Sequence, residues 1–187
     1  MESASRFLAP VVTRLRGALL LCAICALPAT ASAAGTAVGT LIENTASVEF
    51  TQLGAQQSTN SNTVSFLVAE RIDVVVTLRS GQVTVLPGAV AQALLFTVTN
   101  TGNGTEAMEL AINSVVPGDD FDPIPATPDS IFFDTDGSGD FNTGDVAYAA
   151  GVNDPVLAAD ESVDVFLVNN IPGAVTDNNL GRSELRA

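Results

Sequence analysis

Residues 93–99 (ALLFTVT), followed by the turn cluster Asn100-Thr101-Gly102-Asn103-Gly104, decide the fold of this chain. The stretch is rich in the residue types that favour strands, and Leu95 and Phe96 are candidates for the core. The glycines of the cluster supply the positive φ angles that a tight turn needs. We therefore predict a strand over 93–99 that ends at this turn.

Further short stretches rich in Val, Thr, Ile and Phe lie on both sides, bounded by Gly, Pro, Asn and Asp. In 162–168 (SVDVFLV), alternation predicts that Val163, Val165 and Leu167 point inward, and that Ser162, Asp164, Phe166 and Val168 point outward. Strands are also predicted over 46–51, 63–69, 72–79, 108–116, 131–133 and 146–149. The proline-rich segment 117–130 can be neither a helix nor a central strand.

Recurring turns and the lack of an amphipathic helix predict an all-β fold, an immunoglobulin-like β-sandwich preceded by a β-hairpin segment. A single barrel is disfavoured because the strands are unequal and the loops are long. We expect the hairpin segment over 34–70, the sandwich over 71–173 and a tail over 174–187 that starts a strand-like pattern and then stops. The polar tract Leu53–Asn62 is interpreted as a mobile loop of the hairpin.

Residues 1–33 have the features of a cleaved secretory signal peptide. Arg6, Arg14 and Arg16 precede a short apolar run, which is followed by Ala31-Ser32-Ala33, an A-x-A cleavage pattern. The run is shorter than the roughly 20 residues that a membrane-spanning helix needs. We therefore expect export to the periplasm, the cell surface or the medium.

Composition excludes several classes of protein. The chain has no histidine, so a Ser-His-Asp or Cys-His mechanism is excluded. Both cysteines, Cys22 and Cys25, lie in the expected leader, which leaves no disulfide in the mature chain. A formal net charge of −14 without a basic stripe argues against binding of nucleic acid. We expect no catalytic residues and no enzymatic activity.

The stretches Pro87-Gly88-Ala89-Val90 and 95–104 (LFTVTNTGNG) resemble the signature of the bacterial conserved-repeat domain, catalogued as domain of unknown function eleven. Residues 44–48 (NTASV) and 59–66 (TNSNTVSF) resemble the closing hairpin of such a repeat. The resemblance spans roughly residues 38–171. It implies a secreted or surface-exposed structural module of bacteria, often found in tandem within large adhesin-like proteins. Because no sortase motif or other C-terminal anchor follows, we expect the chain to be a piece of a longer protein.

The acidic segment 134–145 (DTDGSGDFNTGD) resembles the calcium loop of an EF-hand. Oxygen-bearing side chains stand at loop positions 1, 3, 5, 9 and 12, with glycine at position 6 and a backbone carbonyl available at position 7. The predicted calcium ligands are Asp134, Asp136, Ser138, Asp140 (through its carbonyl), Asn142 and Asp145. Asp145 replaces the usual glutamate, so modest affinity is expected. Predicted strands flank the loop instead of helices, and the alternative interpretation is a solvated turn.

These features favour an exported structural or adhesive β-sandwich module, calcium-stabilised and part of a larger bacterial protein. Its partners would be other copies or domains of a surface protein, or an extracellular ligand. The alternative is an accessory carbohydrate-binding module of an exported enzyme, which a row of exposed aromatic residues would indicate. The sequence specifies neither the ligand nor the mode of anchoring.

Overall fold

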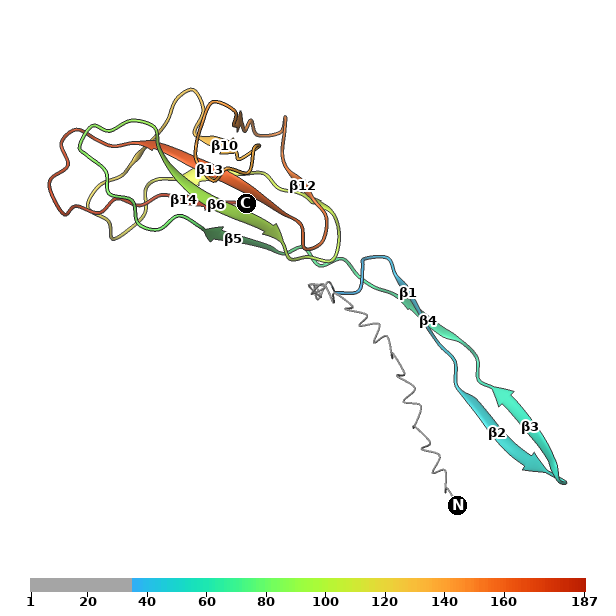
Figure 1. Cartoon of the computed structure of the whole chain (residues 1–187). Coiled ribbons are helices and arrows are strands. Elements are labelled where there is room, and N and C mark those ends of the chain that lie inside the picture. Colours follow the sequence, from blue (N-terminus) through green and yellow to red (C-terminus); the bar gives the residue numbers. More distant parts are fainter. Residues whose placement is uncertain (1–34) are drawn as a thin grey trace, which may run out of the picture. The chain divides into compact units, whose positions relative to one another are not determined.

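In the computed structural model, residues 35–187 are described, and within that range the chain forms only strands, turns and loops. The described residues therefore contain no helix that could cross a membrane. The expected signal peptide, residues 1–33, lies outside the described residues. The prediction of an all-β fold is confirmed, and the strands from β5 onward form a β-sandwich (Figure 1).

The larger layer of the sandwich is a six-stranded antiparallel sheet. Its strands follow the order β11 (Val146–Ala147), β10 (Ile131–Phe133), β13 (Ser162–Asn170), β6 (Gln92–Asn100) and β5 (Val74–Leu78), and β9 (Ile124–Pro125) pairs with the end of β13. The second layer consists of two short ladders. One joins β8 (Ala111–Asn113) to β14 (Glu184–Arg186), and the other joins β7 (Glu106–Ala107) to β12 (Val156–Leu157).

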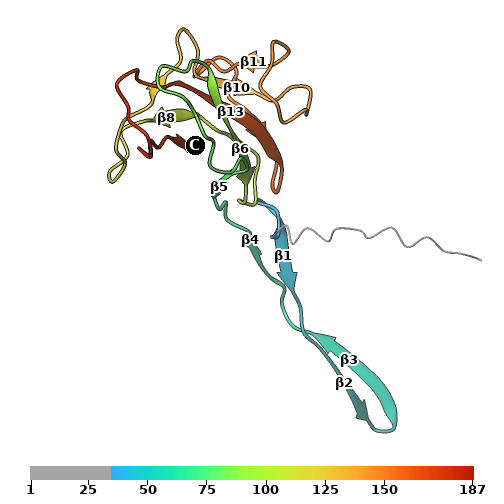
Figure 2. The same cartoon turned by 60° about the vertical axis from the view of Figure 1, so that its left-hand side comes forward.

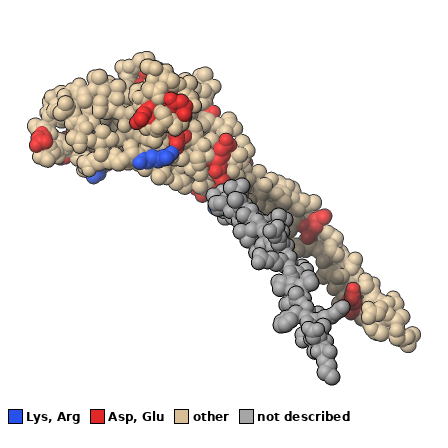
Figure 3. All heavy atoms as spheres, viewed as in Figure 1, with Lys and Arg blue, Asp and Glu red and all other residues tan. Residues whose placement is uncertain are grey.

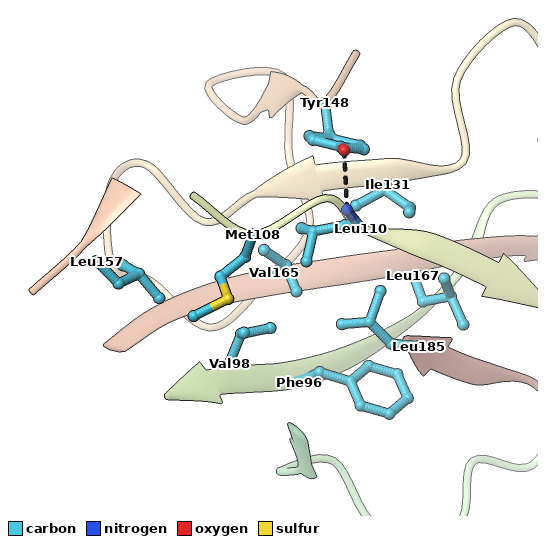
Figure 4. Close-up of a cluster of buried hydrophobic side chains, with 10 residues drawn as sticks. All are labelled: Phe96, Val98, Met108, Leu110, Ile131, Tyr148, Leu157, Val165, Leu167 and Leu185. Carbon is cyan, nitrogen blue, oxygen red and sulfur yellow. Dashed lines mark hydrogen bonds between the residues drawn. The ribbon is translucent and has the colours of Figure 1, made fainter. Parts of the chain in front are cut away.

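The hydrophobic core lies between these two layers. Figure 4 shows Phe96, Val98, Val165 and Leu167 of the sheet facing side chains of the second layer, among them Met108, Leu110, Leu157 and Leu185. The Tyr148 hydroxyl accepts a hydrogen bond from the Leu110 amide at 2.8 Å and donates one to Asp154 Oδ1 at 2.7 Å. A buried tyrosine thus satisfies its polar end inside the core.

The predicted inward face of β13 is confirmed, but its other face is not open to water. Val165 and Leu167 are fully buried, and Val163 packs against the core. Phe166 and Val168, on the opposite face, are each only 2% exposed. Phe141, in the connection that follows β10, packs against Phe166 on this face, which alternation within one strand cannot reveal. The Leu95 side chain points to this outer face, away from Phe96 and the core. It is half-buried there because the loop after β10 lies against it.

Within residues 35–187, the first four strands form a hairpin that pairs only with itself. In one ladder β1 (Leu41–Asn44) pairs with β4 (Val64–Leu67), and in the other β2 (Ser47–Gln52) pairs with β3 (Ala55–Asn60). The interpretation of Leu53–Asn62 as a mobile loop is wrong, because β3 lies within this tract. The turn is only Leu53-Gly54, with φ angles of 51° and 81°, as in a two-residue type I′ turn.

The turn cluster that follows β6 clamps the base of this hairpin. The Asn103 side chain accepts a hydrogen bond from the Arg71 amide at 2.7 Å, and it donates to the carbonyls of Ala69 and Thr36 at 2.9 and 3.1 Å. A Cβ on Gly102 would lie 2.4 Å from the Arg71 carbonyl oxygen, so only glycine fits there. The NTGNG cluster is therefore a junction as well as a turn.

The separation of residues 174–187 from the sandwich as a tail is wrong. Leu185 of β14 is buried in the core, and β14 pairs with β8 through Leu185 and Ile112. Upstream of β14, Asp120 Oδ2 accepts a hydrogen bond from the Leu180 amide at 2.8 Å. Asp119 Oδ2 accepts one from the Arg182 amide at 3.0 Å. These acidic residues of the 117–130 segment hold the C-terminal segment in place.

A carboxyl pair at the hairpin base predicts a dependence of stability on pH. Burial, and then the charge and hydrogen bond of neighbouring Glu70, raise the pKa of Glu106 above its ordinary value of 4.5. A carboxyl whose folded-state pKa is raised stabilises the fold below its unfolded pKa, and this stability is lost as pH rises through the folded pKa. We expect the free energy of unfolding to fall as pH rises above about 4.5, and Glu106→Gln to remove that decrease. Urea unfolding at a series of pH values tests this, with the exposed Glu109→Gln as the control; an unchanged profile in Glu106→Gln would contradict it.

Candidate metal-binding loop

The acidic loop, residues 134–145, connects β10 to β11. The two strands pair antiparallel with Phe133 opposite Val146, so Asp134 and Asp145 leave neighbouring strand ends. Gly137 and Gly139 have φ angles of 66° and 72°, a conformation that glycine adopts without steric cost. The loop can therefore turn its acidic side chains toward a common centre.

Three carboxylates gather at that centre. One oxygen each of Asp134, Asp136 and Asp145 lies within 4.8 Å of the others. Like charges this close repel one another unless donors or a cation balance them. The Ser138 amide donates to Asp134 Oδ1 and Asp136 Oδ1 at 3.1 and 2.9 Å, and the Gly139 amide donates to Asp134 Oδ2 at 3.0 Å. None of the ion pairs found within residues 35–187 involves this loop.

The Asn142 side chain places a hydrogen-bond donor among the predicted ligands. Its Nδ2 donates to Asp136 Oδ2 at 3.1 Å, to Ser138 Oγ at 3.3 Å and to the Asp140 carbonyl at 2.9 Å. Its Oδ1 accepts the Gly144 amide at 2.7 Å. One N–H₂ group thus stands where three oxygens converge.

The six predicted ligands are therefore in one loop centre, but they do not contribute alike. Asp134, Asp136 and Asp145 form the carboxylate group. The Ser138 backbone amide and the Asn142 side chain donate hydrogen bonds to it, whereas the Ser138 hydroxyl bonds to Asn142 and to the Asp140 carbonyl. The Asp140 carbonyl oxygen accepts hydrogen bonds from Ser138 Oγ and Asn142 Nδ2. The Asp140 carboxylate is not a member of the group of three.

The electrostatics of the loop favour a charged, oxygen-rich centre. Hydrogen bonds from Ser138, and then from Asn142, lower the pKa of Asp136 below its ordinary value of 3.8, so this group remains a carboxylate at neutral pH. Asp145 Oδ2 accepts the Asn142 amide at 2.8 Å. Asp145 Oδ1, in contrast, is buried without a hydrogen-bond partner in the described part of the chain. A buried carboxylate oxygen without a donor is costly, and a bound cation would satisfy it.

The loop is anchored to the sandwich by Phe141. Its ring centroid lies 4.9 Å from that of Phe132 and 5.7 Å from that of Phe166, both on the outer face of the sheet. A Cβ on Gly139 would contact Leu95 at 3.8 Å, which places the loop over the same face. Phe141 is the one apolar residue of the loop, and the sequence of the loop alone does not reveal the surface that it covers.

Asp164 links the loop to the rest of the sheet. From the sequence it was predicted only to point outward. Its carbonyl accepts the Asp134 amide at 3.0 Å. Its carboxylate accepts hydrogen bonds from Thr97 Oγ1 and from Arg79, so β13, β6 and the chain after β5 meet there. Only the pairing of distant strands reveals this contact. Figure 3 shows acidic side chains spread over the visible described surface, with basic ones few.

A scan against protein-family models finds no family that matches this chain, and searches of the curated proteins and of the solved structures find no similar protein.

Proposed function

We propose that this chain is an exported, non-enzymatic structural or adhesive β-sandwich module of a larger bacterial surface or secreted protein, and that its 134–145 loop binds Ca²⁺. The leader-like residues 1–33 support export, and the conserved-repeat resemblance supports the structural role. The single observation that carries the calcium assignment is the carboxylate group Asp134, Asp136 and Asp145. Within this group, the buried Oδ1 of Asp145 has no hydrogen-bond partner in the described chain.

Calcium suits this group better than the other common cations. Ca²⁺ takes six to eight oxygen ligands in flexible geometry, and this loop offers carboxylate, hydroxyl, amide and carbonyl oxygens but no nitrogen or sulfur ligand. Mg²⁺ demands a tighter octahedron than a loop with so many adjustable oxygens favours. Because the short Asp145 replaces a bidentate glutamate, we expect Kd in the range of about 10⁻⁴–10⁻³ M.

The distribution of aromatic residues favours a structural module over a carbohydrate-binding one. Tyr148 is buried, and among the described aromatic residues the most exposed are Phe50 and Phe66, which both lie on the hairpin. The described sandwich therefore presents no row of aromatic rings to a sugar. The ion would instead stiffen the β10–β11 connection through Phe141.

Thermal unfolding with and without calcium tests the proposal. At a Kd of about 10⁻³ M, 10 mM Ca²⁺ stabilises the folded state by about 1.4 kcal/mol, which corresponds to a rise in Tm of about 4 °C. We expect this rise with Ca²⁺, a smaller one with Mg²⁺, and reversal by a chelator.

The matched variants are Asp145→Asn in the loop and Asp122→Asn at an exposed position outside it, because both remove one negative charge. Asp145→Asn should lose the response to calcium, whereas Asp122→Asn should keep it. An equal response of the two variants, or no response of the unmodified chain, would refute the site.

A further inference from the structure

Strand β3 of the hairpin has one edge without a partner strand in the described part of the chain. It pairs with β2 alone, and both views show no other strand beside it (Figures 1 and 2). Every residue of β3 is exposed. An unpaired strand edge is a template for pairing with another strand. A two-stranded ribbon is only marginally stable in water, so a further strand on this edge would stabilise the hairpin.

The register of the hairpin determines which backbone groups of β3 face outward. The Ser61 amide donates a hydrogen bond to the Ala46 carbonyl at 2.8 Å, so these opposite residues form a hydrogen-bonded pair. Hydrogen-bonded and non-hydrogen-bonded pairs alternate along an antiparallel ladder. Counting back from Ser61, the N–H and C=O groups of Gln56, Ser58 and Asn60 therefore point away from β2. They are available to a strand on the free edge.

This edge lacks the features that keep exposed strands apart. Proteins protect such edges with charged residues or proline, but residues 53–69, which include β3 and β4, contain neither. The opposite edge of the hairpin carries Glu43 in β1 and Glu49 in β2, and like charges placed opposite each other repel. The free edge of β3 is therefore the hairpin edge at which two copies of this acidic chain can meet.

The sequence of β3 is complementary to itself when two copies pair antiparallel. With Ser58 opposite Ser58 of the second copy, Gln56 of each strand lies opposite Asn60 of the other. Side chains that are directly opposite share one face, with Cβ atoms about 5 Å apart. Amides and hydroxyls both donate and accept hydrogen bonds. Each of these facing pairs can therefore form hydrogen bonds without bringing charges together.

The acidic residues of the two copies stay apart in this arrangement. Glu49 is opposite Ser58 in the β2–β3 ladder, so the two Glu49 residues are separated by three strand spacings, about 14 Å. This exceeds the screening length of about 8 Å at physiological salt. Because β3 runs from the hairpin tip to its base, antiparallel pairing also places the two bases, and the acidic sandwiches joined to them, at opposite ends.

We propose that β3 pairs antiparallel with β3 of a second copy about a two-fold axis at Ser58, so that two hairpins form one four-stranded sheet. The same edge serves on both sides, so the contact is isologous and closes as a dimer. This inference names the partner for the structural role proposed above and rests on that role, but it does not require bound calcium.

Disulfide formation between copies tests the two-fold axis. Cys22 and Cys25, the only native cysteines, are replaced by Ser, and Ser58→Cys is oxidised in air with copper–phenanthroline. Hydrogen-bonded partners have Cα atoms about 5.5 Å apart, a distance that a disulfide spans, so we expect rapid formation of linked dimers. The matched control is Ser47→Cys on β2. Its two copies would lie on the outer strands, about 14 Å apart or more, and should link far more slowly.

Sedimentation equilibrium of variants without added cysteines provides the second measurement. Ser58→Lys places like charges opposite each other and should weaken self-association about tenfold, whereas Ser47→Lys should leave it nearly unchanged. Ser58→Glu should weaken it as well. An equimolar mixture of Ser58→Lys and Ser58→Glu should recover the dimer, because opposite charges then face each other across the axis.

Three results would overturn the proposal. The first is linking of Ser58→Cys no faster than of Ser47→Cys. The second is self-association of Ser58→Lys as strong as that of the unmodified chain, and the third is an unmodified chain that stays monomeric at every concentration. If calcium still raises Tm in any of these cases, the β3 pairing fails while the calcium module stands.

Discussion

Replacing Asn100 by Ala is expected to lower the free energy of unfolding by about 3 kcal/mol, or Tm by about 10 °C. Asn100 is fully buried at the end of β6. Its Nδ2 donates to the carbonyls of Gly104 and Leu157 at 2.8 Å each, and its Oδ1 accepts the Gly102 amide at 2.9 Å. The substitution leaves three buried backbone groups without partners, and each such loss is costly.

The neighbouring Thr101 provides the control for this prediction. Its Oγ1 is buried without a hydrogen-bond partner in the described chain, so Thr101→Val removes a polar atom that makes no bond. We expect Thr101→Val to be neutral or slightly stabilising in thermal and urea unfolding. Equal destabilisation by Asn100→Ala and Thr101→Val would show that the side-chain hydrogen bonds of Asn100 do not hold this junction.

Leu185→Ala should also destabilise the fold by about 3 kcal/mol, the usual cost of truncating a buried leucine. Leu185 is 6% exposed and packs in the core, although it lies near the last residue of the sequence. The effect would establish that β14 is a structural strand of the sandwich. Urea unfolding of the variant measures it directly.

Arg186→Ala is the matched control on the same strand. The Arg186 side chain is exposed and forms an ion pair with Glu184 at 3.0 Å, and a surface ion pair of this kind contributes about 0–1 kcal/mol. If Leu185→Ala lowers the free energy of unfolding no more than Arg186→Ala does, the C-terminal segment does not unfold cooperatively with the sandwich. In that case β14 is not a strand of the second layer.

The sequence predicts the elements whose pattern is local. Alternation within 162–168 correctly places Val165 and Leu167 in the core, and the proline-rich 117–130 contributes only the short β9 at the margin of the sheet. The spacing of oxygens in 134–145 likewise brings Asp134, Asp136 and Asp145 together. These features follow from residues close in the chain, which is why single-sequence reasoning reaches them.

Other features depend on partners distant in sequence. Polar residues such as Gln56 and Gln57 lack a strand-like pattern, yet they pair with Thr51 and Phe50 because a tight turn brings the two segments together. The core position of Leu185 depends on its pairing with Ile112. Burial of Phe166 depends on Phe141, which reaches it from the acidic loop. No pattern within the segments themselves signals these contacts.

A residue-resolved nuclear magnetic resonance titration with Ca²⁺ tests most directly whether the 134–145 loop of this sandwich binds a cation. We expect the backbone amide signals of residues 134–145, including Ser138 and Gly139, to shift together and to saturate at millimolar calcium. Signals of acidic segments elsewhere, such as Asp119 and Asp120, should stay in place. Unshifted loop signals, or equal small shifts at every acidic segment, would contradict it.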